Sequence, residues 1–353
     1  MVLSVLLATA CHHADAPGTV RVQETRPVMG TTMTITVYAR DEATGHRVIA
    51  AAFDRVEEIE AALSHYREQS DLSKLGRAAG GPMMPISRDL YDCLRRSIEV
   101  SVESHGAFDA SIAPLMILWK NAWKAGKLPS EAELAAARAL VDYRSIRLDP
   151  NGPRAHLLRP GMRLDLGGIG KGYAVDQVVA FLRSKGIRAA LVALSGEIYA
   201  LGAPPGREGW RIGVRDPSQP RGPVVDPADM PILSHPLILR DRAVSTSGDY
   251  EQFGVIDGRR YSHILNPATG QPVVEMASVS VVAPDSATAD SYGLVLSVLG
   301  PKAGLDFAAK HQGVEVMILH EAGGKLETLR SGGFGKLEDK KDKEDKEEKK
   351  ANP

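Results

Sequence analysis

The residues best suited to chemistry in this 353-residue chain lie in one short stretch, residues 165–176. Four glycines fall between positions 167 and 172, Asp165 precedes them, and Lys171 stands among them. Apolar side chains recur at helical spacing from residue 173 to residue 185, and a strand-like segment ends at Asp165. The glycines are therefore predicted to form a turn that leads into a helix. Such a turn favours a bound anion, because backbone N–H groups and the helix dipole stabilise negative charge there and Lys171 adds a point charge.

A purely structural role explains this glycine turn equally well, since many glycine-rich turns only join a strand to a helix. The run lacks the Ser or Thr that follows the lysine in a nucleotide-binding P-loop. It also lacks the spacing of a dinucleotide-binding fingerprint. The stretch alone leaves both readings open.

The elements that must position this stretch follow from hydrophobic periodicity. Helices are predicted at residues 41–64, 87–104, 130–141, 173–185 and 286–299, and strands at residues 32–38, 189–194, 210–215, 243–246, 277–283 and 314–320, the last of the chain. Ser130 and Glu133 form the sequence pattern of a capping box, and residues 146–148 and 155–158 suggest a hairpin. Because helices and strands alternate without a strict βαβ rhythm, the prediction is an α+β fold.

Composition excludes two broad classes of function. The net charge is −1, which gives no electrostatic reason to expect nucleic-acid binding. The chain has no uninterrupted run of the roughly 18–20 apolar residues that span a bilayer. Residues 336–353 consist almost entirely of Lys, Asp and Glu, so this tail is expected to be disordered.

The two cysteines have different expected roles. Cys11 ends an apolar segment with small residues, as in a bacterial lipoprotein signal, although no Lys or Arg precedes it. A start site assigned too far downstream would explain the missing charge, and a frayed apolar N-terminus is the alternative reading. A lipid on Cys11 would anchor the protein on the periplasmic side of the inner membrane. Cys93 lies beside the apolar stripe of its helix and is expected to be an inert buried thiol.

Several separated motifs together resemble the FAD:protein FMN transferase family, also called the ApbE-like family. They are Met29-Gly30-Thr31, Gly106-Ala107-Phe108-Asp109, residues 165–176, residues 246–250 with residues 262–270, and Ala289-Asp290 before Val298-Leu299-Gly300. The resemblance runs from about residue 20 to about residue 329. It implies a largely antiparallel sheet with flanking helices in one transferase domain at residues 20–330. Residues 1–19 would then be the signal remnant and tether.

The resemblance implies transfer of FMN from FAD to a Thr or Ser hydroxyl of a target protein, with release of AMP and with Mg²⁺ as metal. The expected acceptor is a flavoprotein of a membrane redox complex. His263 is the expected catalytic base, since its unperturbed pKa is near neutral. By motif position, the expected FAD-binding residues are Met29, Tyr66, Ala107, Phe108, Asp109, Asp165, Lys171 and Leu265. The expected metal-binding residues are Gly168, through its backbone carbonyl, and Asp290.

Three departures from the family pattern concern these sites. Leu294 stands one helical turn after Asp290, where the family usually has Thr, and leucine cannot coordinate a metal. Asn266 replaces the usual Asp, and Ser195-Gly196-Glu197 replaces the usual Gly-Gly-Asp. The expectation is a transferase with a modified metal site. A flavin-binding lipoprotein without activity and an FAD pyrophosphatase that releases FMN and AMP remain as alternatives.

Overall fold

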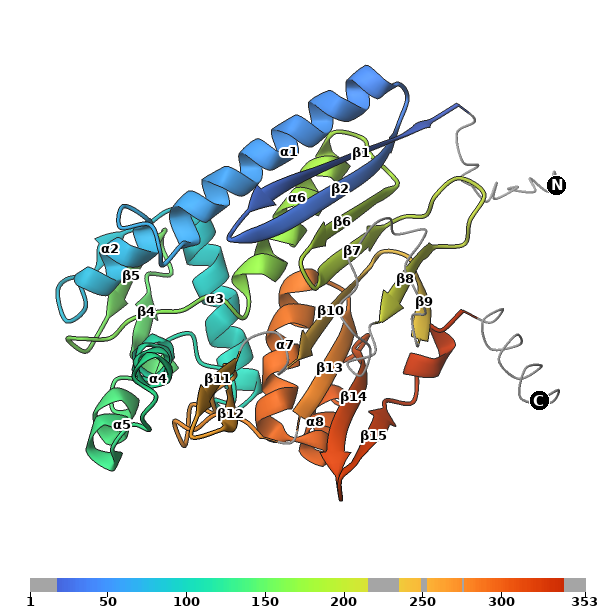
Figure 1. The fold of residues 1–353 in the computed structure, drawn as a ribbon. Coiled ribbons are helices and arrows are strands. Elements are labelled where there is room, and N and C mark those ends of the chain that lie inside the picture. Colours follow the sequence, from blue (N-terminus) through green and yellow to red (C-terminus); the bar gives the residue numbers. More distant parts are fainter. Residues whose placement is uncertain (1–17, 215–234, 249–252, 275, 340–353) are drawn as a thin grey trace, which may run out of the picture.

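The computed structural model describes residues 18–214, 235–248, 253–274 and 276–339. Its centre is a sheet in which eight strands of this part of the chain follow the order β1-β2-β6-β7-β10-β13-β14-β15 (Figure 1). All neighbouring strands pair antiparallel. Their bounds are β1 Val20–Val28, β2 Thr31–Ala39, β6 Ala190–Leu194, β7 Glu197–Leu201, β10 Arg242–Gly248, β13 Met276–Ala283, β14 Glu315–Ala322 and β15 Lys325–Arg330. The predicted α+β class with a largely antiparallel sheet is confirmed.

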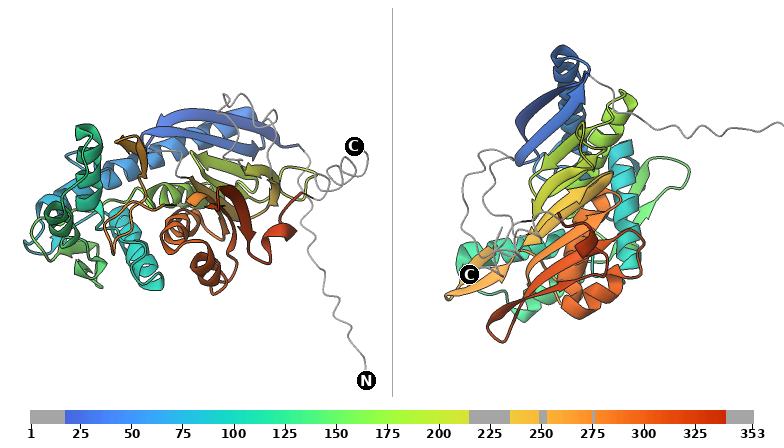
Figure 2. Two further views of the ribbon diagram at one scale, coloured as in Figure 1. Left: turned by 60° about the horizontal axis from the view of Figure 1, so that its bottom comes forward. Right: turned by 90° about the vertical axis from the view of Figure 1, so that its right-hand side faces the viewer.

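Helices cover one face of this sheet. They are α1 (Glu42–Leu63), α6 (Gly170–Ser184), α7 (Ser286–Leu299) and α8 (Pro301–Ala308), with α3 (Arg88–Glu103) packed behind α1 and α7 (Figure 2). Their apolar sides and the strands form the main core. On the other face, the hairpin of β8 (Trp210–Val214) and β9 (His235–Leu239) covers part of the sheet through a second apolar cluster.

A smaller layer extends from the helical side of the molecule. It contains α2 (Asp71–Arg77), α4 (Ala113–Ala125), α5 (Glu131–Arg138), the short turn η1 (Tyr143–Ser145), the small sheet β3 (Met84–Pro85), β5 (Arg154–Leu157) and β4 (Ile146–Leu148), and the hairpin β11 (Phe253–Ile256) with β12 (Arg259–Ser262). The hairpin packs on α4, where a Cβ atom at Gly254 would lie 2.1 Å from the Trp123 ring. Only glycine therefore allows this approach. This layer forms the lower left of Figure 1.

Local capping signals predict the helix starts well. The Asp41 side chain accepts a hydrogen bond from Thr44 N at the start of α1, and Ser87 accepts one from Leu90 N at the start of α3. The capping box of Ser130 and Glu133 is present at α5. Helix α7 has the predicted bounds. These signals depend on only three or four consecutive residues, so they are readable in the sequence.

Strands β1 and β15 were not predicted. The strand predicted at residues 32–38 is present as β2, but its hairpin partner β1 was missed; Met29 and Gly30, with positive φ of 50° and 71°, close the two-residue turn between the two strands. The strand at residues 314–320 is not the last, since β15 follows it after a turn at Gly323 and Gly324. The side chains of β15 are mostly exposed, so the strand lacks the apolar alternation that reveals the others.

The chain ends predicted as signal and tail are only partly described. Cys11 lies outside the described residues, as do residues 340–353. The first residues of the expected disordered tail are ordered instead, with the short turn η2 (Phe334–Lys336) leading into them. Ile238 N donates to Leu337 O at 2.8 Å, and Arg211 pairs with Asp339 at 3.0 Å. In the described part of the chain no helix is long and apolar enough to cross a membrane.

Cys93 behaves as the sequence predicts. Its side chain is fully buried in α3, and burial raises the pKa of its thiol far above the ordinary value. A thiol of this kind stays protonated at neutral pH and is a poor nucleophile.

Candidate functional site

The glycine turn leads directly into α6, as predicted, but protein groups already accept several of its N–H donors. Gly167 N donates to Asp165 Oδ1 at 2.7 Å, and Gly170 N donates to Leu166 O at 2.7 Å. Gly172 N donates to Asp290 Oδ2 at 3.0 Å. These three N–H groups are therefore not available to bind an anion, contrary to the expectation from the sequence. A carboxylate of the protein occupies the place at the helix end where a phosphate was expected.

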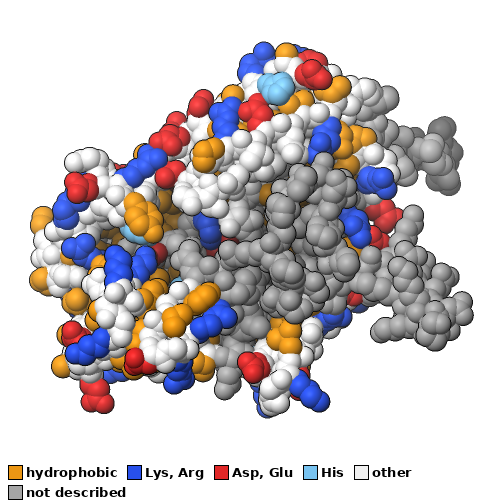
Figure 3. Space-filling model, viewed as in Figure 1, with side chains coloured by type: hydrophobic (Ala, Val, Ile, Leu, Met, Phe, Trp, Pro, Cys, Tyr) orange, Lys and Arg blue, Asp and Glu red, His pale blue; other side chains and the backbone are white. Residues whose placement is uncertain are grey.

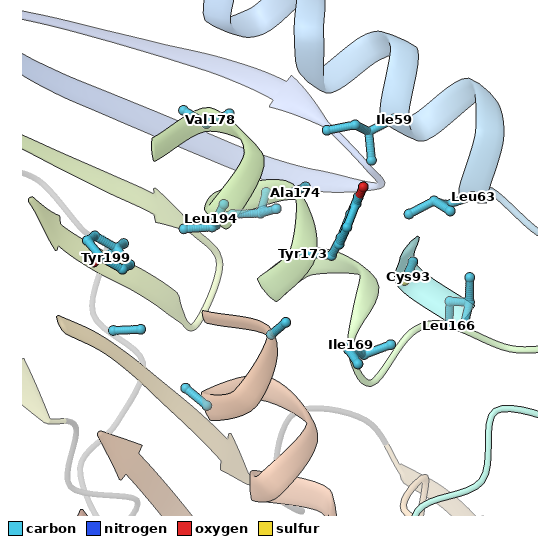
Figure 4. Close-up of a cluster of buried hydrophobic side chains, with 14 of the residues drawn as sticks. Ile59, Leu63, Cys93, Leu166, Ile169, Tyr173, Ala174, Val178, Leu194 and Tyr199 are labelled. Carbon is cyan, nitrogen blue, oxygen red and sulfur yellow. The ribbon is translucent and has the colours of Figure 1, made fainter. Parts of the chain in front are cut away.

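Helices α6 and α7 cap each other. Asp290 of α7 accepts from the first turn of α6, and Asp176 of α6 accepts from Ser286 N at 2.7 Å and Ala287 N at 2.9 Å in the first turn of α7. A Cβ atom at Gly172 would lie 2.3 Å from Ser286 O, so the helices can approach this closely only at a glycine. On its other side α6 is held by Tyr173, whose ring points toward Ile59 and Leu63 of α1 (Figure 4) and whose hydroxyl donates to Asp89.

Gly172→Ala is expected to lower the free energy of unfolding by about 2–3 kcal/mol, because the added methyl group would collide with a main-chain carbonyl. Urea denaturation monitored by circular dichroism measures this change. Gly76→Ala in α2 is the matched control, since a Cβ atom there meets no atom within 4 Å. A Gly172→Ala protein as stable as the control would contradict the close packing of α6 on α7.

Asp176 makes the stability of this helix pair depend on pH. Burial, with a further contribution from Asp285, raises the pKa of Asp176 to about 7 from an ordinary value of 3.8, although two backbone N–H groups oppose the shift. The folded protein thus binds more protons than the unfolded chain between these pKa values, and its stability falls as pH rises through this window. The expected loss approaches about 1.4 kcal/mol per pH unit at its steepest.

Denaturation of the wild type and of Asp176→Asn at a series of pH values tests this dependence. The asparagine cannot ionise, so the difference in unfolding free energy between the two proteins isolates the single group. The wild type should lose unfolding free energy relative to Asp176→Asn as pH rises from 5 to 7.5. Parallel curves over this range would show that Asp176 keeps an ordinary pKa.

The polar centre of the site joins three residues that are far apart in the sequence. Lys171 Nζ lies 2.9 Å from Glu197 Oε1, 3.6 Å from Asp290 Oδ1 and 3.5 Å from the carbonyl oxygen of Gly167. The side chains of Glu197 and Asp290 are only 6% and 3% exposed, whereas that of Lys171 is 28% exposed. Burial and the neighbouring Asp290 charge raise the pKa of Glu197, while the Lys171 ammonium lowers it.

Glu197 is the member of this polar centre that sequence reasoning missed. It is the first residue of β7 and follows a two-residue turn in which Ser195 adopts a positive φ of 57°. The sequence shows Glu197 only as a departure from the family pattern at the end of a strand. Its approach to Lys171 depends on the pairing of β6 with β7 and on the packing of α6 over both strands, which no local signal reveals.

A cavity of about 590 Å³ adjoins the glycine turn. It lies between α2, α4 and residues 163–165, and its lining includes three cations, Arg77, Lys120 and Arg163, and two acids, Glu68 and Asp165. Lys and Arg side chains, blue in Figure 3, gather over this layer of the molecule. The size falls within the range of small-ligand pockets, and the cations suit an anionic ligand.

Two of the predicted FAD-binding residues belong to this cavity or its rim. Asp165 lines it directly. Tyr66 is 79% exposed and contacts the lining residue His65 with a centroid distance of 3.9 Å and a tilt of 41° between the rings, and Lys120 Nζ lies 6.0 Å from the Tyr66 ring centre. Met29 lies in the β1–β2 turn, where its N–H donates to Glu60 Oε2 at 2.8 Å. Glu60 in turn pairs with Arg67, the residue after Tyr66, so α1 links the two predicted positions.

The segment 107–109 packs against the glycine turn. A Cβ atom at Gly168 would lie 3.4 Å from the ring of Phe108, which is buried, while Ala107 is half-buried against the main core. The Asp109 carboxylate accepts from Ser111 N and Tyr143 N, each at 2.8 Å, and from the Ser111 hydroxyl. Burial raises the pKa of Asp109 despite these bonds. The carboxylate thus has a structural role in its own loop.

His263 and Leu265 follow β12 on the α4 side of the molecule. His263 is half-buried, and Leu265 is buried against Leu115 and Trp119 of α4. The Asn266 side-chain oxygen accepts from Ala268 N at 2.9 Å and Thr269 N at 3.4 Å. Asparagine and aspartate both form this turn, so the Asn266 departure has a structural explanation. Asp249 and Tyr250 of the same motif lie outside the described residues.

The predicted metal residues Gly168 and Asp290 both lie near the α6–α7 contact, where the apolar side chain of Leu294 also lies. A Cβ atom at Gly168 would lie 2.1 Å from Leu294 Cδ1. Among the described residues no three His, Cys, Asp or Glu side chains converge as a metal cluster. Mg²⁺ nevertheless needs only one or two carboxylates with water or substrate oxygens. The Asp290 carboxylate and the buried Glu197 Oε2, which has no hydrogen-bond partner within the described structure, suit such a hard cation.

Comparisons with known proteins agree with this architecture. The ApbE family model matches residues 29–318. A FAD:protein FMN transferase of Treponema pallidum is 32% identical over 90% of both chains, and one of Klebsiella pneumoniae is 30% identical over 83% of this chain and 87% of its own. The apo crystal structure of the Pseudomonas stutzeri flavinyl transferase ApbE has a TM-score of 0.76 at 29% identity, covering 90% of this chain and 97% of its own. The Thermotoga maritima ApbE protein has a TM-score of 0.79 at 27% identity, covering 91% of this chain and all of its own. The chain therefore belongs to the ApbE family.

Proposed function

We propose that this protein transfers FMN from FAD to a Thr or Ser hydroxyl of an acceptor protein and releases AMP, in a reaction that depends on Mg²⁺. The observation that carries the proposal is the buried centre of Lys171, Glu197 and Asp290, which lies at the end of the turn whose first residue, Asp165, lines the cation-rich cavity. A cavity for an anionic ligand thus adjoins charged groups of the kind that phosphoryl transfer uses.

FAD binding is assigned to the cavity and its rim. Arg77, Lys120 and Arg163 supply positive charge for the diphosphate, and the exposed ring of Tyr66 offers a face on which a flat aromatic ring can stack. Lys171, held at the start of α6 by two carboxylates, is the cation nearest to the glycine turn in this assignment. A positively charged donor close to the transferred phosphoryl group stabilises the charge that develops on it.

The chemical step exchanges a phosphoanhydride bond of FAD for a phosphoester bond to the acceptor. The oxygen of the acceptor hydroxyl bonds to the phosphorus on the FMN side of the diphosphate, while the bond from that phosphorus to the bridging oxygen breaks and its electron pair leaves with AMP. The hydroxyl proton passes to His263, whose unperturbed pKa near neutrality suits a general base. Asp290 and the Gly168 carbonyl oxygen would hold Mg²⁺, which when bound neutralises charge on the diphosphate.

Analysis of the nucleotides formed from FAD tests the proposal. Purified protein is incubated with FAD and Mg²⁺, with and without a candidate acceptor domain, and the products are separated by chromatography. Transfer predicts that AMP appears only when acceptor is present and that the acceptor becomes fluorescent in a denaturing gel. Equal amounts of free FMN and AMP without acceptor would identify a pyrophosphatase, and intact FAD in both samples would identify a flavin carrier.

The proposal includes a lipid anchor on Cys11, which would place the domain on the periplasmic side of the inner membrane beside a membrane redox complex. The support is the apolar segment that ends in small residues before Cys11. In cells fed a labelled fatty acid, the full chain should carry the label and partition with membranes, whereas Cys11→Ser should do neither. Equal labelling of both proteins would exclude this anchor.

A further inference from the structure

Among the described residues, the two buried carboxylates of the site share one nearby ammonium, that of Lys171. Glu197 and Asp290 both face Lys171, at 2.9 Å and 3.6 Å, and both acids are almost completely shielded from solvent. With both acids ionised, two buried carboxylates beside one ammonium leave an excess of negative charge, which is unfavourable in a region of low dielectric constant and raises the pKa of Glu197. A second positive charge at this place would remove that excess.

One carboxylate oxygen remains open to a further partner. With Glu197 ionised, its buried Oε2 has no hydrogen-bond donor in the described part of the chain, and the residue is only 4% exposed. Buried polar atoms are nearly always satisfied, so an orphaned carboxylate oxygen points to a ligand. Asp290 Oδ2 already accepts from Gly172 N, while Oδ1 faces the ammonium at 3.6 Å, longer than a hydrogen bond.

The acids are held rigidly, whereas the lysine can move. Glu197 begins a central strand after a tight turn, and Asp290 is fixed by its bond to the α6 main chain. Lys171 extends a flexible four-carbon chain with 28% of its side chain exposed, so its ammonium has a route toward the open side. The two carboxylates therefore form a site for a cation, which the Lys171 ammonium occupies here but whose geometry does not depend on Lys171.

We propose that Glu197 is an anionic ligand of the divalent cation, together with Asp290, and that the ion replaces the Lys171 ammonium between the two carboxylates. The inference rests on the Mg²⁺-dependent function proposed above and adds a ligand to it. Glu197 supplies the oxygen that Leu294, one turn after Asp290, cannot supply. The displaced ammonium becomes available to the anionic diphosphate.

Metal titration of the purified flavin-free protein tests the exchange without any need for transfer activity. Mn²⁺ serves as the probe for Mg²⁺, with binding followed by calorimetry and by the loss of the free Mn²⁺ electron paramagnetic resonance signal. Glu197→Gln should weaken binding at least about tenfold. Lys171→Met should tighten it by about tenfold, because the competing cation is gone. Glu103→Gln is the matched control, since Glu103 also contacts α7, through the Tyr292 hydroxyl, but lies in a separate network with Arg96.

Unchanged Mn²⁺ affinity in Glu197→Gln would overturn the proposal. Thermal unfolding in EDTA verifies that each variant is folded. If Glu197→Gln does not fold, Lys171→Met provides the test, because unchanged Mn²⁺ affinity in that variant would show that the ion does not replace the Lys171 ammonium. The expected affinity pattern in a protein that transfers no FMN would refute the proposed function and keep Glu197 as a ligand. Normal FMN transfer by Glu197→Gln together with unaltered Mn²⁺ binding would keep the proposed function and reject Glu197 as a metal ligand.

Discussion

Asp290→Asn is expected to reduce the rate of FMN transfer by at least about a thousandfold while the protein remains folded. Asp290 accepts a hydrogen bond from the main chain of α6, faces the Lys171 ammonium and is a proposed metal ligand. Asparagine keeps an oxygen that can accept from Gly172 N, so the contact between α6 and α7 survives. It removes the charge that the Lys171 ammonium and a divalent cation both require.

Steady-state kinetics of Asp290→Asn should therefore show the loss in kcat, with a melting temperature close to that of the wild type. Asp285→Asn is the matched control on the same helix, because Asp285 caps α7 through Thr288 N and asparagine is an equally good N-cap. The control should retain nearly full activity. Equal activities for the two variants would remove Asp290 from the reaction.

His263→Ala is expected to slow transfer by about a hundredfold to ten-thousandfold and to leave FAD affinity within about twofold of the wild type. The reason is that a general base acts on the acceptor proton in the transition state, whereas FAD is assigned to the cavity between α2 and α4. The two effects are separable by fluorescence titration with FAD and by single-turnover transfer.

The pH dependence of His263→Ala distinguishes a base from a residue that only supports the loop. Wild-type kcat should rise with pH through a pKa near neutrality, and the variant should lose this rise. Added imidazole should restore part of the rate if the pocket of His263 remains open. A wild-type pH profile in His263→Ala, or undiminished transfer, would exclude His263 as the base.

Local sequence signals predicted much of the framework for a physical reason. The Ser130–Glu133 pair satisfies helix-end donors within a few residues, so the sequence alone contains both partners. The α6 turn and helix were predicted from the glycine run and from apolar residues at helical spacing, which are also local signals. Strands β1 and β15 were missed because their mostly exposed side chains give no clear apolar alternation.

The chemistry of the site was predicted less completely, because it depends on contacts between distant segments. Lys171 and Asp290 were identified by motif, but the Glu197 carboxylate that holds the ammonium follows from sheet pairing and helix packing. The glycine run was expected to leave its donors open to phosphate. Instead Gly172 allows α7 to approach α6, and its N–H is used by Asp290. Glycine suits both the close approach of two helices and the exposure of N–H groups to a ligand, so the glycine run alone cannot distinguish these two roles.

The measurement that most directly tests the central claim is the intact mass of an acceptor domain after incubation with this protein, FAD and Mg²⁺. The account predicts a gain equal to one FMN residue, located by peptide fragmentation on a Thr or Ser, with one AMP released for each modified acceptor. The same incubation with Asp290→Asn should leave the acceptor mass unchanged. An unmodified acceptor after wild-type treatment, for a domain that a related FAD:protein FMN transferase does modify, would contradict the account.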